Sequence, residues 1–160
     1  MNVLVVSNYD IKGGAARATY RLHKGLQSIG VDSQILAGYK FSDDKTVRLM
    51  PTKLGENFKS LKPKLNRLPL KLYPKLGQVI FSPQWVPDSL ASEVTKINPD
   101  VINLHWVCEG YMQIETLAKF NKPIVWTLHD MWAFTGGCHY SESCERYIDA
   151  CGACPQLHST

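Results

Sequence analysis

Short β-branched runs alternate with segments of helical periodicity along this chain of 160 residues, and this alternation constrains the fold more than any other feature. Residues 2–7 (NVLVVS) predict a buried strand, and a glycine-bearing turn follows it. Apolar side chains then recur at helical spacing over residues 16–29, and Gly30 is suited to cap the helix end. Residues 33–37 (SQILA) predict a second strand. A strand, a helix and a strand in this order favour a right-handed crossover in a parallel sheet.

The alternation continues in the second half of the chain. A helix is expected from about residue 88 to residue 97, a strand over 100–104, a helix over 112–120 and a strand over 124–128. Strands that alternate with helices in this way predict an α/β fold, a Rossmann-like three-layer sandwich with a mainly parallel sheet. We expect residues 1–160 to form one such domain, which is long enough to bury a hydrophobic core.

Two polar pairs follow predicted strands directly, where open α/β sheets bind their ligands. His129 and Asp130 come after the strand 124–128 and are the candidate catalytic residues, with the histidine placed to hydrogen-bond a substrate hydroxyl or stabilise a developing charge. The alternative is a histidine that is satisfied by the backbone of its own loop. His105 and Trp106 follow the strand 100–104 in the same way, and they are interpreted equally as a ligand cleft or as a packing site.

Gly13 and Gly14 lie between the first strand and its helix. Without side chains, they allow backbone N–H groups to approach a ligand at a helix N-terminus, a position that favours an anion such as a diphosphate. Arg17, in the first helical turn, is placed to pair with that anion. The alternative is a tight turn without a ligand and a solvated arginine. The spacing differs from GxGxxG, so a dinucleotide site is not indicated.

A loop over residues 136–156 contains four cysteines in a C-x5-C-x6-C-x2-C pattern. Four thiolates suit a closed, tetrahedral structural zinc site, and His139 is a possible substitute ligand. Disulfides, an iron–sulfur cluster and free thiols remain alternatives. A closed site has no open position for water, so we expect this metal to fold a loop and not to catalyse. The predicted ligands are Cys138, Cys144, Cys151 and Cys154.

The middle of the chain, about residues 51–78, is a basic insertion in a protein of net charge +4. Three prolines predict that no single long helix passes through it, although a short amphipathic helix over about residues 53–62 is expected. The insertion is either a solvated loop or a basic surface for anionic lipid or a lipid-linked diphosphate. Nucleic acid is not expected, because aromatic residues are not interleaved with the cations. The cations are Lys53, Lys59, Lys62, Lys64, Arg67, Lys71 and Lys75.

The apolar run near the N-terminus, residues 3–6, is too short for a signal peptide or a membrane span. We therefore expect a cytoplasmic protein, with possible contact to the inner face of the cytoplasmic membrane through the basic insertion.

Several of these segments together resemble the N-terminal half of a GT-B glycosyltransferase of family 4, of the bacterial type that includes colanic acid and capsule enzymes. The matching segments are residues 7–36, residues 99–107 (PDVINLHWV), residues 122–140 (KPIVWTLHDMWAFTGGCHY) and residues 151–157 (CGACPQL). The third segment is the specific one, since the front glycine motif alone is a weak signal.

The resemblance implies a two-domain enzyme that transfers a hexosyl group from a nucleotide-sugar donor to a growing surface polysaccharide or a lipid-linked acceptor. It implies retention of anomeric configuration and no catalytic metal. Gly13, Gly14 and Arg17 would lie near the donor diphosphate, and His129 would contact the donor sugar. His105 and Trp106 would line the acceptor cleft. The donor-binding domain with its E-x7-E motif is absent from this sequence, so the chain corresponds to the acceptor-side half and is expected to be inactive alone. The alternatives are a metal-stabilised docking module without catalysis, and another nucleotide-sugar enzyme such as an epimerase.

Overall fold

The computed structural model describes residues 1–51, 55–76 and 79–159, and it shows a single sheet covered by helices on both faces. The described residues form five parallel strands in the order β3-β2-β1-β4-β5, which confirms the predicted α/β fold with a parallel sheet. The strands are β1 (Asn2–Tyr9), β2 (Asp32–Tyr39), β3 (Val47–Leu49), β4 (Val101–Leu104) and β5 (Ile124–Trp126).

Strand β1 lies at the centre of the sheet, where Val5 is paired with Ile35 of β2 and with Asn103 of β4. Its β-branched run is buried on both faces, as expected for a central parallel strand. Side chains alternate between the two faces of a strand, so β1 contributes to two separate cores. Val3 and Val5 belong to one core, and Leu4 and Val6 belong to the other.

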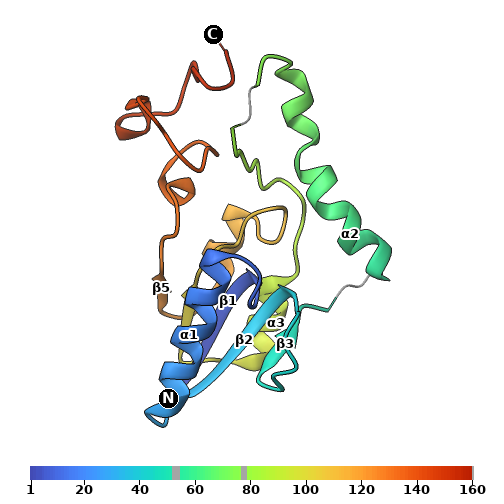
Figure 1. Ribbon diagram of the computed structural model, residues 1–160, viewed down its shortest axis with the longest axis vertical. Coiled ribbons are helices and arrows are strands. Elements are labelled where there is room, and N and C mark those ends of the chain that lie inside the picture. Colours follow the sequence, from blue (N-terminus) through green and yellow to red (C-terminus); the bar gives the residue numbers. More distant parts are fainter. Residues whose placement is uncertain (52–54, 77–78, 160) are drawn as a thin grey trace.

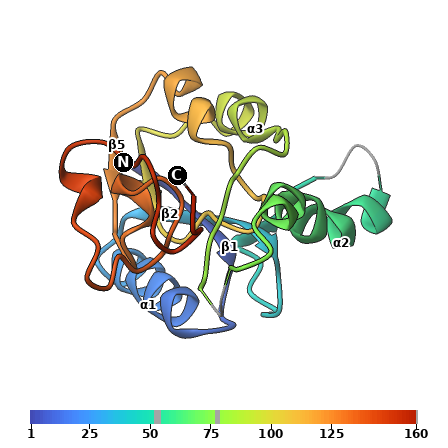
Figure 2. The ribbon, with the colours of Figure 1, turned by 90° about the horizontal axis from the view of Figure 1, so that it is seen from above.

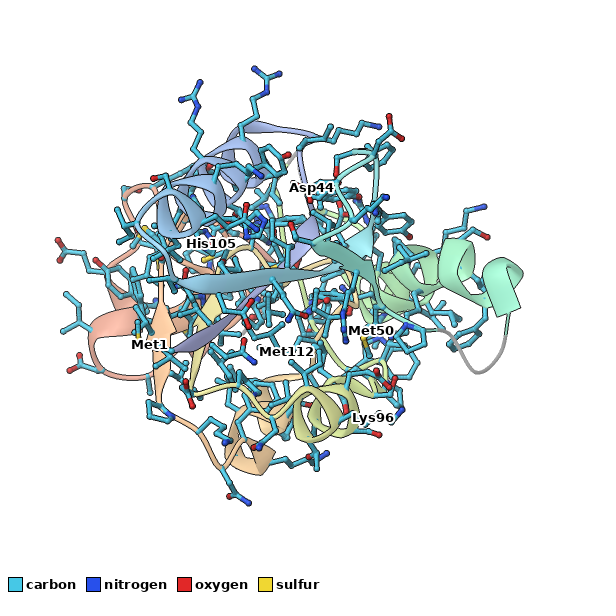
Figure 3. All side chains as sticks on the ribbon, turned by 90° about the horizontal axis from the view of Figure 1, so that it is seen from below. Met1, Asp44, Met50, Lys96, His105 and Met112 are labelled. Atoms are coloured by element: carbon cyan, nitrogen blue, oxygen red, sulfur yellow. The ribbon has the colours of Figure 1, made fainter. Side chains whose placement is uncertain are left out.

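Helix α1 (Gly14–Ser28) covers the first face and packs through Tyr20 and Leu26 against the smaller core. Helix α3 (Leu90–Ile97) covers the second face, and Figures 2 and 3 show the sheet between these two helices. Met112, labelled in Figure 3, is fully buried in the larger core on the α3 side. Complete burial of an aliphatic side chain of this size contributes about 1.5–3 kcal/mol.

Three elements differ from their sequence-based expectations. Strand β3 was not predicted, because a run of three residues carries too little periodicity. The predicted helix over 112–120 is a shorter 3₁₀ helix, η2 (Ile114–Lys119). Strand β5 ends at Trp126, two residues before the predicted end, since its partner β4 ends opposite it at Leu104. His129 therefore lies in a loop beyond the strand end.

Within the basic insertion, helix α2 (Gly55–Asn66) continues past Pro63, whereas an end near Lys62 was expected. Proline removes its own N–H donor and crowds the carbonyl four residues earlier, but its own carbonyl still accepts a hydrogen bond from the Arg67 backbone N–H at 3.3 Å. A separate 3₁₀ helix, η1 (Leu68–Leu72), follows, so no single long helix runs through the described part of the insertion, as predicted. The start of the expected helix, including Lys53, lies outside the described residues.

The insertion and the C-terminal segment both extend beyond the end of the sheet opposite the N-terminus (Figure 1). Because all strands run parallel from the N-terminal side, this is the carboxyl edge of the sheet. The C-terminal segment contains two short 3₁₀ helices, η3 (Trp132–Phe134) and η4 (Arg146–Ile148). No helix within the described residues is both long enough and apolar enough to cross a membrane.

Candidate active site at the carboxyl edge of the sheet

Two histidines meet at the ends of β4 and β5. The Nδ1 atom of His105 lies 2.9 Å from the Nε2 atom of His129, which identifies a hydrogen bond between the rings. His105 is only 3% exposed, and its Nε2 atom lies 2.7 Å from Oδ1 of Asn103. His129 is half-buried and keeps part of its ring at the surface. The two strand-end positions predicted from the sequence are thus brought into direct contact.

Both histidines are held neutral near pH 7. Burial, together with a smaller effect of the neighbouring His129, lowers the pKa of His105 to about 4. Burial also lowers the pKa of His129, while the carboxylate of Asp130 opposes this shift. A neutral imidazole offers one hydrogen-bond donor and one acceptor, so this pair can orient a polar ligand without adding charge.

Asp130 is bound on both carboxylate oxygens. Its Oδ2 atom accepts hydrogen bonds from Trp106 Nε1 at 2.9 Å and His139 Nδ1 at 2.6 Å, and its Oδ1 atom accepts one from the Trp132 backbone N–H at 3.0 Å. Burial raises the pKa of Asp130, but the hydrogen bonds led by His139 outweigh it, so the pKa lies below its usual value. The structure therefore gives Asp130 contacts that hold the loop in place.

His139, the predicted substitute zinc ligand, is buried within this network. Its other ring nitrogen, Nε2, lies 2.9 Å from the hydroxyl of Ser82, so both nitrogens have protein partners. No sequence pattern indicated this contact, because Ser82 and His139 lie 57 positions apart.

A hollow of about 220 Å³ lies beside the first turn of α1 and is lined by Gly13, Gly14, Lys12, Tyr9 and Trp106, among others. Gly13 adopts φ 98°, a conformation that favours glycine, and no side chain caps this helix N-terminus. Trp106 also lines the hollow around His105, His129 and Asp130, so it joins the two predicted parts of the site.

The two cations near the glycines occupy different places. Arg17 is exposed on α1, and its backbone N–H donates to the Gly13 carbonyl at 3.1 Å. Lys12, which sequence reasoning missed, lines the hollow itself and holds its Nζ atom 5.3 Å from the centre of the Phe41 ring. The position of Lys12 next to the glycine pair was the sequence signal that could have identified it as a site residue. The structure places Lys12, rather than Arg17, at the mouth of this hollow.

A second hollow, of about 170 Å³, lies under α2 and was not predicted. Its lining includes Tyr39, Phe58, Lys62, Asp88 and Glu109, so an apolar wall carries a cation and carboxylates. Burial lowers the pKa of Lys62, and the nearby Asp88 opposes this shift. The hollow connects the basic insertion to the carboxyl edge of the sheet.

All four cysteines of the C-terminal loop line one hollow of about 180 Å³. The Gly136 backbone N–H donates to Cys151 Sγ at 3.1 Å, and a Cβ atom on Gly136 would lie 2.7 Å from that of Cys151. Each of these cysteines is a free thiol in the structure. Within the described residues, no group of three or more histidine, cysteine or acidic side chains is placed to hold a metal ion. The structure thus gathers the predicted ligands around one space without assembling a metal site, and zinc stays a prediction.

Comparison with known proteins bears on this geometry. A family model described as Glycosyltransferase Family 4 matches residues 12–150, a range that contains the glycine pair and both histidines. The chain is also 24% identical, over 173 aligned residues, to an Escherichia coli K12 protein named "Putative colanic acid biosynthesis glycosyl transferase WcaC". This alignment covers 99% of the chain but 40% of that relative, so the chain spans less than half of the relative's length. No solved structure gives a significant match. The family match shows that the chain belongs to Glycosyltransferase Family 4.

Proposed function

We propose that this chain forms the acceptor-side half of a retaining glycosyltransferase. The enzyme would transfer a hexosyl group from a nucleotide-sugar donor to a growing surface polysaccharide or lipid-linked acceptor. The observation that carries this proposal is the neutral, half-buried His129, held by His105 beyond the carboxyl ends of β4 and β5. Family membership and the similarity to a relative named for colanic acid biosynthesis support the same reaction class.

The residues suggest separate contacts for the sugar and the diphosphate of the donor. His129 would hydrogen-bond a hydroxyl of the donor sugar close to the reacting carbon. Gly13 and Gly14 would admit the diphosphate to the N-terminus of α1, where backbone N–H groups and the helix dipole favour an anion. Lys12 lines the same hollow and would add a positive charge. No catalytic metal is part of this proposal.

The acceptor would occupy the side of the cleft near α2. The hollow under this helix combines an apolar wall with Lys62, which suits a saccharide attached to a lipid diphosphate. The outer side of the insertion exposes leucines next to cations, and Leu72 is 80% exposed. Such a surface would attract an anionic membrane through charge and apolar contact. This arrangement favours a cytoplasmic protein that visits the inner face of the membrane. The exposed cations described there are Lys64, Arg67, Lys71 and Lys75.

The four-cysteine loop is proposed to bind one structural zinc ion through Cys138, Cys144, Cys151 and Cys154. Their shared hollow and the N–H···S contact to Cys151 support the choice of these four cysteines as the ligands. Their present positions do not form it. Zinc would therefore have to draw the sulfurs together, and no step of sugar transfer is assigned to it.

Sugar transfer can be tested in a protein that joins this chain to a donor-binding domain. We expect His129→Ala to lower kcat for transfer by on the order of 10²-fold, as the loss of one oriented polar contact at a reacting centre commonly does. The matched control is His158→Ala, which removes an exposed histidine of the C-terminal segment. Both variants should keep the wild-type circular dichroism spectrum and a cooperative melting transition, although the loss of the His105 partner should lower the melting temperature of His129→Ala.

Unchanged transfer in folded His129→Ala would contradict the proposed role and would favour a docking module. This chain alone is expected to bind acceptor weakly and to transfer no sugar, because it contains no E-x7-E motif. Transfer by the chain alone would show that the division into acceptor and donor halves is wrong.

A further inference from the structure

We propose that Asn103 and His105 are positioning residues that fix the proton of His129 on Nε2 and leave its Nδ1 atom bare. His129 would then present a hydrogen-bond acceptor, so the ligand group it selects must be a donor such as a hydroxyl. The identification of this hydroxyl with a sugar rests on the proposed function, whereas the tautomer itself does not.

The orientation of the Asn103 amide is the first step. Its Nδ2 atom lies 3.0 Å from the carbonyl oxygen of Val125 and 3.2 Å from Oγ1 of Thr127. A backbone carbonyl can only accept a hydrogen bond, so this side of the amide must be the NH₂ group. The Oδ1 atom of Asn103 therefore faces His105, and the side chain is 5% exposed, which leaves little freedom for a flip.

The second step sets the proton of His105. Its Nε2 atom lies 2.7 Å from Asn103 Oδ1, an oxygen that can only accept. His105 must consequently carry its proton on Nε2. Burial lowers the pKa of His105 to about 4, so near pH 7 the ring has no second proton and its Nδ1 atom is a bare acceptor.

The third step transmits this choice to His129. The only hydrogen bond that a bare His105 Nδ1 can make with His129 Nε2, 2.9 Å away, has His129 as the donor. The ring centres lie 5.1 Å apart with planes inclined by 30°, which suits such an edge-to-edge contact. His129 therefore carries its proton on Nε2, and its Nδ1 atom remains an acceptor because burial also lowers the pKa of this residue.

We call this series of hydrogen bonds from Asn103 through His105 to His129 the relay. The backbone around the relay is fixed as well. The His105 backbone N–H donates to the Val6 carbonyl of β1 at 2.9 Å, and the His105 carbonyl accepts from Trp126 Nε1 at 3.2 Å. Both contacts come from the sheet or its edge. The relay thus begins in the rigid part of the domain and ends at the half-buried ring that the ligand would meet.

His139 provides an opposite case in the same protein. Its Nδ1 atom donates to the carboxylate of Asp130 at 2.6 Å, and its Nε2 atom faces the hydroxyl of Ser82. A carboxylate can only accept, so His139 carries a proton on Nδ1. The two histidines are therefore expected to hold their protons on different nitrogens, and each serves as the reference for the other.

The relay can be read by ¹⁵N NMR of the histidine side chains, in which protonated and bare ring nitrogens resonate far apart. In the wild-type chain at pH 7 we expect His129 to be protonated on Nε2 and His139 on Nδ1. A His129 ring protonated on Nδ1, or an even mixture of the two forms, would overturn the proposal without any variant.

The variant Asn103→Asp tests whether the relay causes this preference. A carboxylate beside the buried His105 raises the pKa of that ring and favours its doubly protonated form. His105 would then donate from Nδ1 as well, so His129 must accept through Nε2, and its proton should move to Nδ1. The His139 signals should not change. The same spectrum reports both ring nitrogens of His105, and an unchanged His129 tautomer beside a doubly protonated His105 in Asn103→Asp would show that another group sets it, which would also overturn the proposal.

The variant His105→Phe gives a second test if Asn103→Asp does not fold, because it keeps the bulk of the ring and removes the acceptor. We expect the His129 preference for Nε2–H to be lost in this variant, and retention of the preference would contradict the relay. None of these spectra requires transfer activity. A failure of the relay is therefore distinguishable from a failure of the proposed function, which the transfer assay of His129→Ala tests separately.

Discussion

The carboxylate of Asp130 should be one of the largest single contributors to the stability of the C-terminal half of this domain. Asp130→Ala leaves three donors without an acceptor: the indole N–H of the partly buried Trp106, the ring of the buried His139 and the backbone N–H of the buried Trp132. His139 is 2% exposed and Asp130 11% exposed in their side chains, so water cannot readily replace the lost partner. A donor left without an acceptor away from water costs about 1–3 kcal/mol, so the loss of the acceptor for all three donors costs about 3–5 kcal/mol. We expect a loss in this range in the free energy of unfolding.

Urea unfolding followed by tryptophan fluorescence measures this loss, since Trp106 and Trp132 both contact Asp130 directly. The midpoint should fall while the denaturant slope stays unchanged, because the same surface is exposed on unfolding. The matched control is Asp149→Ala, which removes an exposed carboxylate from the same segment and should change stability by about 0.5 kcal/mol or less. A loss below about 1 kcal/mol in Asp130→Ala would refute the reasoning, because it would mean that the three donors find other partners or water.

Further predictions concern pH, metal and membrane. The pKa of His105 falls from 6.5 in the unfolded chain to about 4 in the fold, so the unfolded state binds the extra proton first. The free energy of unfolding should therefore drop by about 3 kcal/mol as the pH falls from 6.5 to 4. Urea unfolding at several pH values measures this drop, and a flat profile would contradict the prediction. Plasma mass spectrometry should find about one zinc per chain that is lost in Cys151→Ser; metal-free protein with titratable thiols would exclude the site. Co-sedimentation with anionic vesicles should weaken with salt and in Leu72→Asp, and no binding at low salt would exclude membrane contact.

The fold was predictable where the hydrophobic pattern is unambiguous. Residues 2–7 contain a valine-rich run that is buried on both faces, and Gly30, with φ 80°, follows the end of α1 as expected for a helix cap. Strand β3 and helix η2 were missed or misjudged because short elements are set by their tertiary neighbours and not by their own periodicity. Helix α2 continues through Pro63 for the same reason, because tertiary packing outweighs the local tendency of proline to end a helix.

The site was predictable in position but not in connectivity. Strand ends indicated His105, His129 and Asp130, because carboxyl ends of parallel strands share one edge. The partners of Asp130 could not be found, since the return of the loop to His139 and the reach of Trp106 from the end of β4 are set by tertiary structure. Asn103 carried a usable signal that was overlooked. It lies two residues before His105 on a strand, and alternate residues of a strand share a face.

The consecutive residues after β4 and β5 form two matched cross-links between the strand ends. His105 contacts His129 at 2.9 Å, and Trp106 contacts Asp130 at 2.9 Å. The first cross-link is neutral and leaves part of the His129 ring at the surface, and the second is tied into a buried network through His139. A loop fixed at two adjacent residues cannot rotate one of them independently, so the Asp130 contacts hold the His129 ring in place before any ligand arrives. Preorganisation of this kind avoids an entropic cost at the reacting centre. Asp130→Ala should therefore loosen His129 as well as destabilise the domain, although Asp130 itself need not touch the substrate.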